Sequence, residues 1–500
     1  MAKLPQDRYA SAREVSQVLL EMQHPGQTAS SGRARGQSKM PSVAVLPFAN
    51  LSADPDNQYF SDGLSEDLIS ALTRLPGLHV TSRTSAFRFR DGKMDIREIG
   101  RQLSVDSVLE GSVRRSGQRV RITAQLVNVV DGYHLWSERY DREITDIFEI
   151  QDEITAAIIK TLEPTLLGQQ SALTRRHSEN LQAYDLYLKG RLFWDQRSES
   201  SLRAGLECFR AAIDLDPGYA LAYLGVADSF SILAVYGYMS LSDGRPRAEA
   251  AMRRALGLDP TLLDAHFSLC VSSTIFGRPG EAAGHFRKAL ELQPRSSLVH
   301  AYHALYLASR RHTEEALASV RIATGLDPLS PLIHGLCGVS LQCSGYYEEA
   351  LQESERSLEL QPNSILGLWS RQLAACHLSR WHESFAAGER LVSVTRRSAI
   401  YLGQLAMAYG MAGQRDRALA LHEELVQRQQ AGEYISPVAF LAIDAGLRDV
   451  EAVRADILAY LEDGGNGWAI EVALGSYLDE FATYPACAEL LRRIARTGET

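Results

Sequence analysis

Three groups of residues in this 500-residue chain have types and spacings that suggest chemistry. His300 and His303 stand three residues apart in a helical stretch, a spacing that can place two imidazoles on one metal ion. No third ligand is evident, so packing or solvent-facing histidines are the expected explanation and we predict no metal site. Asp62, Glu66 and Asp67 resemble a carboxylate cluster. Acids in the first turn of a helix favour its dipole, which is the simpler interpretation.

Four arginines form a third group, Arg114, Arg115, Arg119 and Arg121, on both sides of a Ser-Gly turn. They are predicted to lie at the tip of a β-hairpin. One interpretation is a patch that binds an anion or an acidic partner. The other is a solvated sheet edge, where charge discourages pairing with a further strand.

Motifs of common active sites are absent from the sequence. There is no G-x-x-x-x-G-K-[ST] phosphate loop, no H-E-x-x-H helix and no G-x-S-x-G nucleophile turn. We therefore predict no catalytic residues and no cofactor, so the chain is expected not to be an enzyme. The net charge of -9 argues against a nucleic-acid partner held by general electrostatics.

The cysteines and the apolar runs bear on the compartment. All six cysteines lie after residue 200 without a C-x-x-C pair, and most are in apolar helical stretches. They are expected to be reduced core residues, as in a reducing compartment. No apolar run approaches the roughly 18 residues of a membrane span. Residues 1–23 also lack the apolar centre of a signal peptide. We expect a cytoplasmic protein.

A repeated Leu-(Asp/Gln)-Pro motif organises the chain after about residue 181. Its prolines are Pro217, Pro260, Pro294, Pro328 and Pro362, separated by 43, 34, 34 and 34 residues. A 34-residue helix-turn-helix unit is the tetratricopeptide period. The nine extra residues of the first interval are expected around 236–244, which is rich in turn formers. Residues 181–500 are thus predicted to form an all-α tetratricopeptide superhelix of seven or eight hairpins.

Stacked hairpins of this kind build a concave wall from the first helix of each unit. By helical position the wall should include Phe267, Val271, Leu298, Leu305, Leu332 and Val339. Their apolar character predicts a groove for an amphipathic helix or an extended peptide. The alternative is that some of them only pack one repeat against the next.

Residues 41–165 alternate strand and helix patterns in the order β-α-β-α-β-β-β-α. The strands are expected at 42–48, 78–81, 107–115, 119–129 and 133–140, and the helices at 62–75, 95–103 and 146–162. This order predicts a small α/β domain with a mixed sheet, in front of the helical repeats.

The stretches SVAVLPFANLSADPDNQYFSDGLSEDLISALTRL and VLEGSVRRSGQRVRITAQLVNVVDGYHLWSERYDREI resemble the TolB amino-terminal-like module. That module precedes tetratricopeptide repeats in many bacterial signalling proteins, behind a Ser/Thr kinase, a nucleotide cyclase or a winged-helix DNA-binding domain. No catalytic residues are attributed to it. The resemblance implies a non-catalytic scaffold or sensor that binds a protein or peptide and could self-associate.

The first 22 residues, with the stretch AKLPQDRYASAREVSQVLLEM, resemble the last helix of a protein-kinase domain. Arg8 would match the arginine of the kinase C-lobe. Residues 23–40 are small and polar and are predicted to be a flexible linker. The other kinase motifs are missing from this chain. The alternative function is therefore the regulatory C-terminal part of a truncated Ser/Thr kinase.

Overall fold

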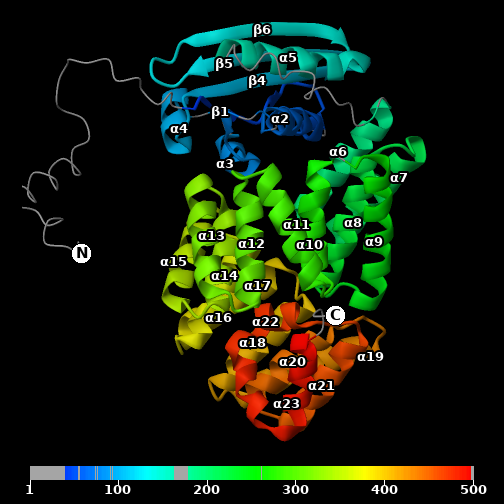
Figure 1. Ribbon diagram of the computed structural model, residues 1–500, viewed down its shortest axis with the longest axis vertical. Coiled ribbons are helices and arrows are strands. Elements are labelled where there is room, and N and C mark those ends of the chain that lie inside the picture. Colours follow the sequence, from blue (N-terminus) through cyan, green and yellow to red (C-terminus); the bar gives the residue numbers. More distant parts are fainter. Residues whose placement is uncertain are drawn as a thin grey trace, which may run out of the picture. The chain divides into compact units, whose positions relative to one another are not determined.

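The computed structural model describes residues 40–496, apart from 163–177 and positions 55, 56, 74, 76, 91, 93, 179 and 261. The chain divides into two compact units, residues 1–40 and 41–500. The predicted kinase-like helix (1–22) and nearly all of the linker (23–40) lie outside the described residues. The description below concerns the second unit (Figure 1).

The α/β module is built on one mixed sheet. Its strands are β1 (Ser42–Val45), β2 (Ala49–Asn50), β3 (His79–Val80), β4 (Ser107–Ser116), β5 (Arg119–Asn128) and β6 (His134–Glu143). The order is β3-β1-β4-β5-β6, and β2 also pairs with β4. β1 runs parallel to β3 and β4, whereas β4, β5 and β6 are antiparallel. The mixed sheet predicted from the sequence is confirmed.

Four helices belong to this module: α2 (Gln58–Thr73), α3 (Arg83–Ala86), α4 (Ile96–Leu103) and α5 (Ile147–Leu162). Apolar residues four apart place Leu64 and Leu68 of α2 and Ile150 and Ile154 of α5 on one face of each helix. They share one core with Ile122 of β5. Residues of α4 belong to a second core with β1 and β4 residues. The sheet is therefore covered by helices over much of its area.

Several details differ from the expected elements. α2 begins at Gln58, four residues earlier than expected, and α3 was not expected. The first strand ends at Val45, because Pro47 lacks the N–H that would continue the ladder. The chain then pairs again with β4 through Ala49 and Asn50.

Eight helical hairpins follow. They are α6/α7 (Leu181–Asp195, Glu199–Leu215), α8/α9 (Ala220–Val235, Leu241–Leu258), α10/α11 (Leu263–Ile275, Pro279–Leu292), α12/α13 (Ser297–Ser309, Thr313–Leu326), α14/α15 (Pro331–Cys343, Tyr347–Leu360), α16/α17 (Ile365–His377, Trp381–Val394), α18/α19 (Ala399–Met411, Arg415–Gln430) and α20/α21 (Pro437–Leu447, Val450–Glu462). Ala282, Phe286 and Ala289 of the repeat motif are buried between helices. The tetratricopeptide architecture is confirmed.

The extra residues of the second hairpin are not one inserted loop at 236–244. α8 has 16 residues and α9 has 18, whereas α10 and α11 have 13 and 14. Most of the insertion therefore lengthens the two helices. The reason is a helix cap: the Ser240 side chain accepts the Asp243 N–H at 3.0 Å, so α9 begins at Leu241.

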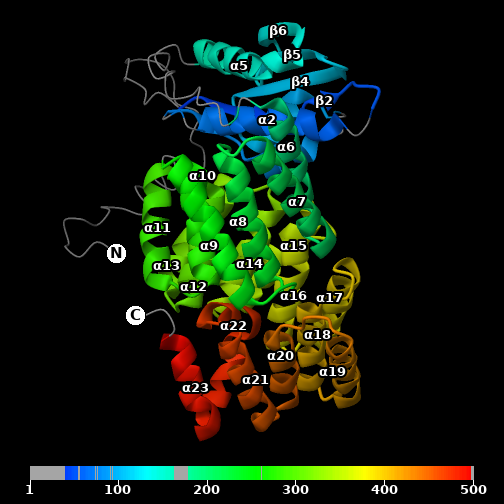
Figure 2. The ribbon, with the colours of Figure 1, turned by 90° about the vertical axis from the view of Figure 1, so that its right-hand side faces the viewer.

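First helices of successive hairpins pack on one another, from α6 through α16 and again from α18 to α20. We call this layer the inner wall. The chain ends with α22 (Gly467–Leu474), two short 3-10 turns (Gly475–Asp479 and Phe481–Thr483) and α23 (Pro485–Arg496). α22 contacts α10, α12, α14 and α20, all of which belong to the inner wall. In Figure 2 it lies between the α12–α14 region and α20–α21.

Candidate functional site

The six residues predicted to line the groove divide into two sets. Leu305 and Val339 are buried, with 6% and 0% of their surface exposed, and belong to the core between hairpins. For these two, packing of repeat against repeat is the explanation that the structure supports. The other four, Phe267, Val271, Leu298 and Leu332, are half-buried on the inner wall. Their role in ligand binding stays a prediction.

Part of the inner wall is already occupied by the chain itself. Residues 466–479, here called the return segment, lie against the first helices of distant hairpins. Val472 is buried in one cluster with Ala301 of α12 and Leu336 of α14, and Trp468 packs on the same cluster. Sequence reasoning missed this contact, because the periodicity of α22 does not indicate which surface covers its apolar side.

Polar contacts hold the return segment at both ends. The Asn466 side chain donates to the carbonyl of Ile275 at 2.6 Å and accepts the N–H of Trp468 at 2.8 Å. The second contact satisfies a free donor of the first turn of α22. Farther along, Arg311 pairs with Asp479 at 2.8 Å and with Glu471 at 3.5 Å. The segment is therefore an apolar helix with acidic residues that match one arginine of the wall.

An aromatic stack completes this contact. The His377 ring lies between Tyr347 and Tyr477, with centroid distances of 4.2 and 3.9 Å. Burial lowers the pKa of His377 to about 4, so the imidazole is neutral near pH 7. Within the described residues, neither His377 Nε2 nor Trp468 Nε1 has a hydrogen-bond partner. The contact between segment and wall is thus mainly apolar and aromatic.

The acids Asp62, Glu66 and Asp67 do not occupy the first turn of α2, because the helix begins at Gln58. The dipole interpretation is wrong for this reason. Asp62 instead accepts two hydrogen bonds from Arg90, at 2.8 and 2.9 Å. All three acids have defined partners, so they form a structural network and not a free catalytic pair.

Glu66 and Asp67 face α6, the first helix of the repeats. Arg83 contacts Glu66 at 2.5 Å and Asp195 at 2.9 Å, and Arg191 lies 3.6 Å from Glu66. Burial raises the pKa of Glu66 above its ordinary value. These groups form the charged part of what we call the joint, the contact of α2 and α5 with α6.

Asp67 connects three helices of the joint. It accepts hydrogen bonds from Tyr184 of α6 and, at 3.0 Å, from Gln151 of α5. Burial raises the pKa of Asp67 to about 6. Gly63 adds a close approach, since a Cβ at this position would lie 2.4 Å from Leu188 of α6. The α/β module and the first hairpin consequently share one core.

A second contact reaches the repeat motif itself. Ser82 and Ser85, at the start of α3, donate to the carboxylate of Asp327. Asp327 is the acid of a Leu-Asp-Pro motif, and nearby Leu329 packs in the core with Leu46 of the module. The motif that marks the repeat period therefore also connects the fourth hairpin to the α/β module.

The four predicted arginines do not form one patch. Arg119 and Arg121 both pair with Asp141, at 2.7 and 2.5 Å, and hold the pKa of that carboxyl at about 2. Arg114 donates to the carbonyl of Leu51, whereas Arg115 pairs with Asp185 of α6 at 3.2 Å. The sheet-edge interpretation is wrong for Arg119 and Arg121, because β5 lies between β4 and β6. Arg114 and Arg115 lie beyond Val113, the last residue of β4 that pairs with β2.

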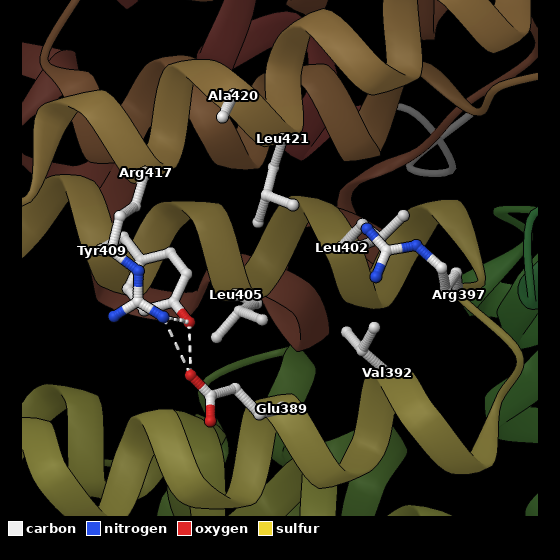
Figure 3. A pocket seen from close by; sticks show the side chains of 9 residues that line it. All are labelled: Glu389, Val392, Arg397, Leu402, Leu405, Tyr409, Arg417, Ala420 and Leu421. Atoms are coloured by element: carbon white, nitrogen blue, oxygen red, sulfur yellow. Dashed lines mark hydrogen bonds and ion pairs between the residues drawn. The ribbon is translucent and has the colours of Figure 1, made fainter.

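A pocket of about 370 Å³ lies between α17, α18 and α19 (Figure 3). Leu402, Leu405 and Leu421 supply apolar lining. At one end Glu389 accepts hydrogen bonds from Tyr409 at 2.7 Å and Arg417 at 2.9 Å. At the other end Arg397 pairs with Glu424. Because the charges are matched by neighbours, the pocket suits an apolar side chain better than an anion.

Other candidate sites have structural explanations. His300 contacts the Pro294 carbonyl at 3.0 Å and His303 contacts Ser319 at 3.2 Å. Within the described ranges, no group of three or more His, Cys, Asp or Glu residues could hold a metal ion. All six cysteines are free thiols. No helix in the described part of the chain is long and apolar enough to cross a membrane.

Comparison with known proteins follows the same division of the chain. Residues 38–157 match the family model "HilA/YgeH-like transcriptional regulator, second domain". A protein named "Putative adenylate cyclase 3" of Rhizobium meliloti (strain 1021) is 37% identical over 265 residues. That match covers 53% of this chain and 42% of the relative, so this chain spans less than half of the relative's length.

The solved structures that match this chain do so at low identity. TolB from Acinetobacter baumannii is 17% identical with a TM-score of 0.21, covering 25% of this chain and 29% of TolB. A tetratricopeptide repeat protein from Parabacteroides merdae ATCC 43184 is also 17% identical, with a TM-score of 0.33. The match covers 63% of this chain and 98% of the Parabacteroides merdae chain. Both are proteins of the two kinds that the sequence was found to resemble.

Proposed function

We propose that this chain is the non-catalytic regulatory part of a bacterial signalling protein, in which the helical repeats bind a helical segment of a protein partner. The tetratricopeptide-like architecture supports a protein-binding scaffold. The matches to a cyclase-named relative and to a transcriptional-regulator family support a role beside an effector. Which effector the chain regulates is part of this proposal.

One observation carries the choice of ligand. The inner wall holds the return segment as it would hold a bound helix. Val472 and Trp468 of the segment make the apolar contact. At the ends, Asn466 of the segment bonds to Ile275, and Asp479 of the segment pairs with Arg311. A partner suited to this wall is an amphipathic helix with aromatic and β-branched residues on one face and acids at its C-terminal end. The half-buried Phe267, Val271, Leu298 and Leu332 extend the apolar wall available to it.

The joint provides a route by which such binding would affect the α/β module. Glu66, Asp67 and the shared core couple α2 and α5 to α6, and Asp327 couples α3 to the fourth hairpin. A change in the curvature of the repeats would therefore displace the residues that make these contacts. The proposal assigns the α/β module the task of passing this change to the effector.

A labelled peptide with the sequence of residues 464–484 tests the proposal on the full chain by fluorescence anisotropy. The receptor carries Glu471→Arg and Asp479→Arg, so that Arg311 repels its own return segment but still attracts the peptide. We expect this variant to bind at least tenfold more tightly than the unmodified chain, in which the site is occupied. Glu314→Arg with Glu355→Arg is the matched control, because both acids are exposed on outer helices.

Hydrogen exchange of residues 466–479 shows whether the segment has been released. Should exchange remain slow, Val472→Asp provides a stronger release. A released segment without peptide binding would overturn the proposal.

A second candidate effector is a Ser/Thr kinase, favoured by the AKLPQDRYASAREVSQVLLEM stretch at the N-terminus. On this alternative the chain is the regulatory C-terminal part of that kinase. Sequencing of the DNA upstream of Met1 distinguishes the effectors. An in-frame kinase domain supports the second candidate, a cyclase or winged-helix domain supports another effector, and stop codons with a ribosome-binding site argue against a fused effector.

A further inference from the structure

β6 ends the sheet and exposes a long edge. It has ten residues, and its outer edge pairs with no other strand among those described. Most of its side chains are exposed on both faces. An exposed edge of this length presents unpaired N–H and C=O groups to another strand, unless its side chains prevent the approach.

The hydrogen-bond pattern shows which residues present these groups. Ile144 donates its N–H to the Gln118 carbonyl of the β5 side at 2.7 Å. In an antiparallel ladder the direction alternates, so Tyr140 and Arg142 also bond toward β5. Ser137, Arg139 and Asp141 consequently direct their N–H and C=O groups outward.

The charges along this edge are self-complementary about Tyr140. The sequence reads Glu138-Arg139-Tyr140-Asp141-Arg142. If a second copy pairs antiparallel about a two-fold axis through Tyr140, Arg139 faces Asp141 and Glu138 faces Arg142, each twice. Opposite charges directly across an antiparallel pair are stabilising, and like charges are destabilising.

Neighbouring registers lack this property. An axis through Arg139 would place Arg139 opposite its own copy, and an axis through Asp141 would do the same with a carboxylate. An axis through Glu138 would also join like charges. The charge pattern therefore selects one register of the pair.

The backbone is compatible with this register. With the axis at Tyr140, the residues that face each other across it are Arg139 and Asp141, whose backbone groups point outward. They would exchange two hydrogen bonds, as a hydrogen-bonded pair of an antiparallel ladder does. Tyr140, whose backbone groups are used by β5, would lie on the axis between these pairs.

The two most exposed large apolar side chains of the described residues lie at one end of the same edge. They are Val130, which is 86% exposed, and Tyr133, which is 74% exposed, and Leu135 beside them is 43% exposed. In the selected register Trp136 would lie opposite Ile144 of the second copy. The apolar turn would then reach the start of the copy's α5, where its exposed surface could be covered.

We propose that two copies of this chain associate through β6, in antiparallel register about Tyr140, so that their two sheets form one continuous sheet. Closed two-fold assembly is the commonest form of oligomer, and it requires a self-complementary surface of this kind. The inference is independent of the peptide-binding function, because β6 is not part of the inner wall.

Sedimentation velocity of the full chain from about 1 to 100 µM tests the proposal. Glu138→Arg places a second guanidinium opposite Arg142, twice in each dimer, and should weaken dimerisation roughly tenfold or more. The double variant Glu138→Arg with Arg142→Glu restores opposite charges and should return the dissociation constant to within about threefold of the unmodified chain. This pair avoids Asp141, which is already engaged by Arg119 and Arg121. Arg142 also pairs with Glu153 at 3.1 Å, but that pair is exposed and single.

Two further variants test the backbone hydrogen bonds across the dimer and the effect of a charge reversal elsewhere on the surface. Ser137→Pro removes an outward N–H and leaves the β5 ladder intact, so it should also weaken the dimer. Arg101→Glu, at a residue 71% exposed on α4, should leave association unchanged. A monomer throughout the concentration range, a double variant as weak as Glu138→Arg, or a dimer unaffected by Ser137→Pro would each overturn the proposal. Circular dichroism confirms that each variant is folded.

Discussion

The joint and the contact of the return segment attach distant parts of the chain by different means. The joint encloses charged groups, with Glu66 between Arg83 and Arg191 and Asp67 between Tyr184 and Gln151. The return segment buries apolar and aromatic groups, and the ion pair of its Asp479 with Arg311 is exposed. Breaking a buried ion pair leaves an unpaired charge in the protein interior. Losing an apolar contact costs only the transfer free energy of the buried area and the free energy of the cavity that remains. The joint is therefore suited to permanent attachment, and the return segment to exchange.

The largest effect is expected at the joint. Glu66→Ala leaves Arg83 and Arg191 without their shared carboxylate and should destabilise the contact by about 3 kcal/mol. Native-state hydrogen exchange of α2 and α6 measures this free energy of opening. Glu98→Ala is the control, because its pair with Arg101 is exposed and should contribute less than about 0.5 kcal/mol. Equal effects of the two substitutions would contradict the comparison.

Asp67 should make the joint sensitive to pH. Its pKa is about 6 in the folded protein, above the ordinary 3.8, so the folded state binds the proton more tightly. This contribution to stability is full below about pH 4 and is lost as the pH rises through 6, by roughly 3 kcal/mol. Thermal unfolding between pH 4 and 7 checks this. Asp67→Asn should flatten the dependence, and an unchanged slope would exclude Asp67 as its source.

Val472→Ala should loosen the return segment by about 1.5 kcal/mol, because it removes two methyl groups from a buried site. Hydrogen exchange of α22 should accelerate about tenfold while α2 and α6 stay unchanged. Ile322→Ala, at an exposed position of α13, serves as the control. Equal acceleration in both regions would mean that the two contacts open together.

The smallest effect is expected for Asp479→Ala in the labelled peptide. The pair of Asp479 with Arg311 is exposed, at 53% and 59% of the two side chains, and should contribute about 0.5 kcal/mol or less. The effect should decrease further at 1 M salt, where the Debye length is about 3 Å. Peptide binding to the released receptor, measured with and without salt, checks this. A loss above about 2 kcal/mol would show that charge, and not apolar burial, holds the segment.

Much of the fold was predictable from periodicity. The spacing of the Leu-(Asp/Gln)-Pro motif indicated the hairpins and their 34-residue period. The inner-wall positions followed from the same register, but their exposure did not. Leu305 and Val339 are buried because neighbouring helices cover them, and one repeat contains no information about its neighbours' curvature.

Local sequence determined the elements, their order and the repeat period, because helix and strand periodicity, caps and prolines act over a few residues. Only the tertiary structure decided that Asp327 binds Ser82, that Glu66 and Asp67 join α2 to α6, and that residues 466–479 lie on the inner wall. These contacts join residues that are far apart in the sequence. Their partners are selected by shape and charge once the array has curved, which no short-range pattern records.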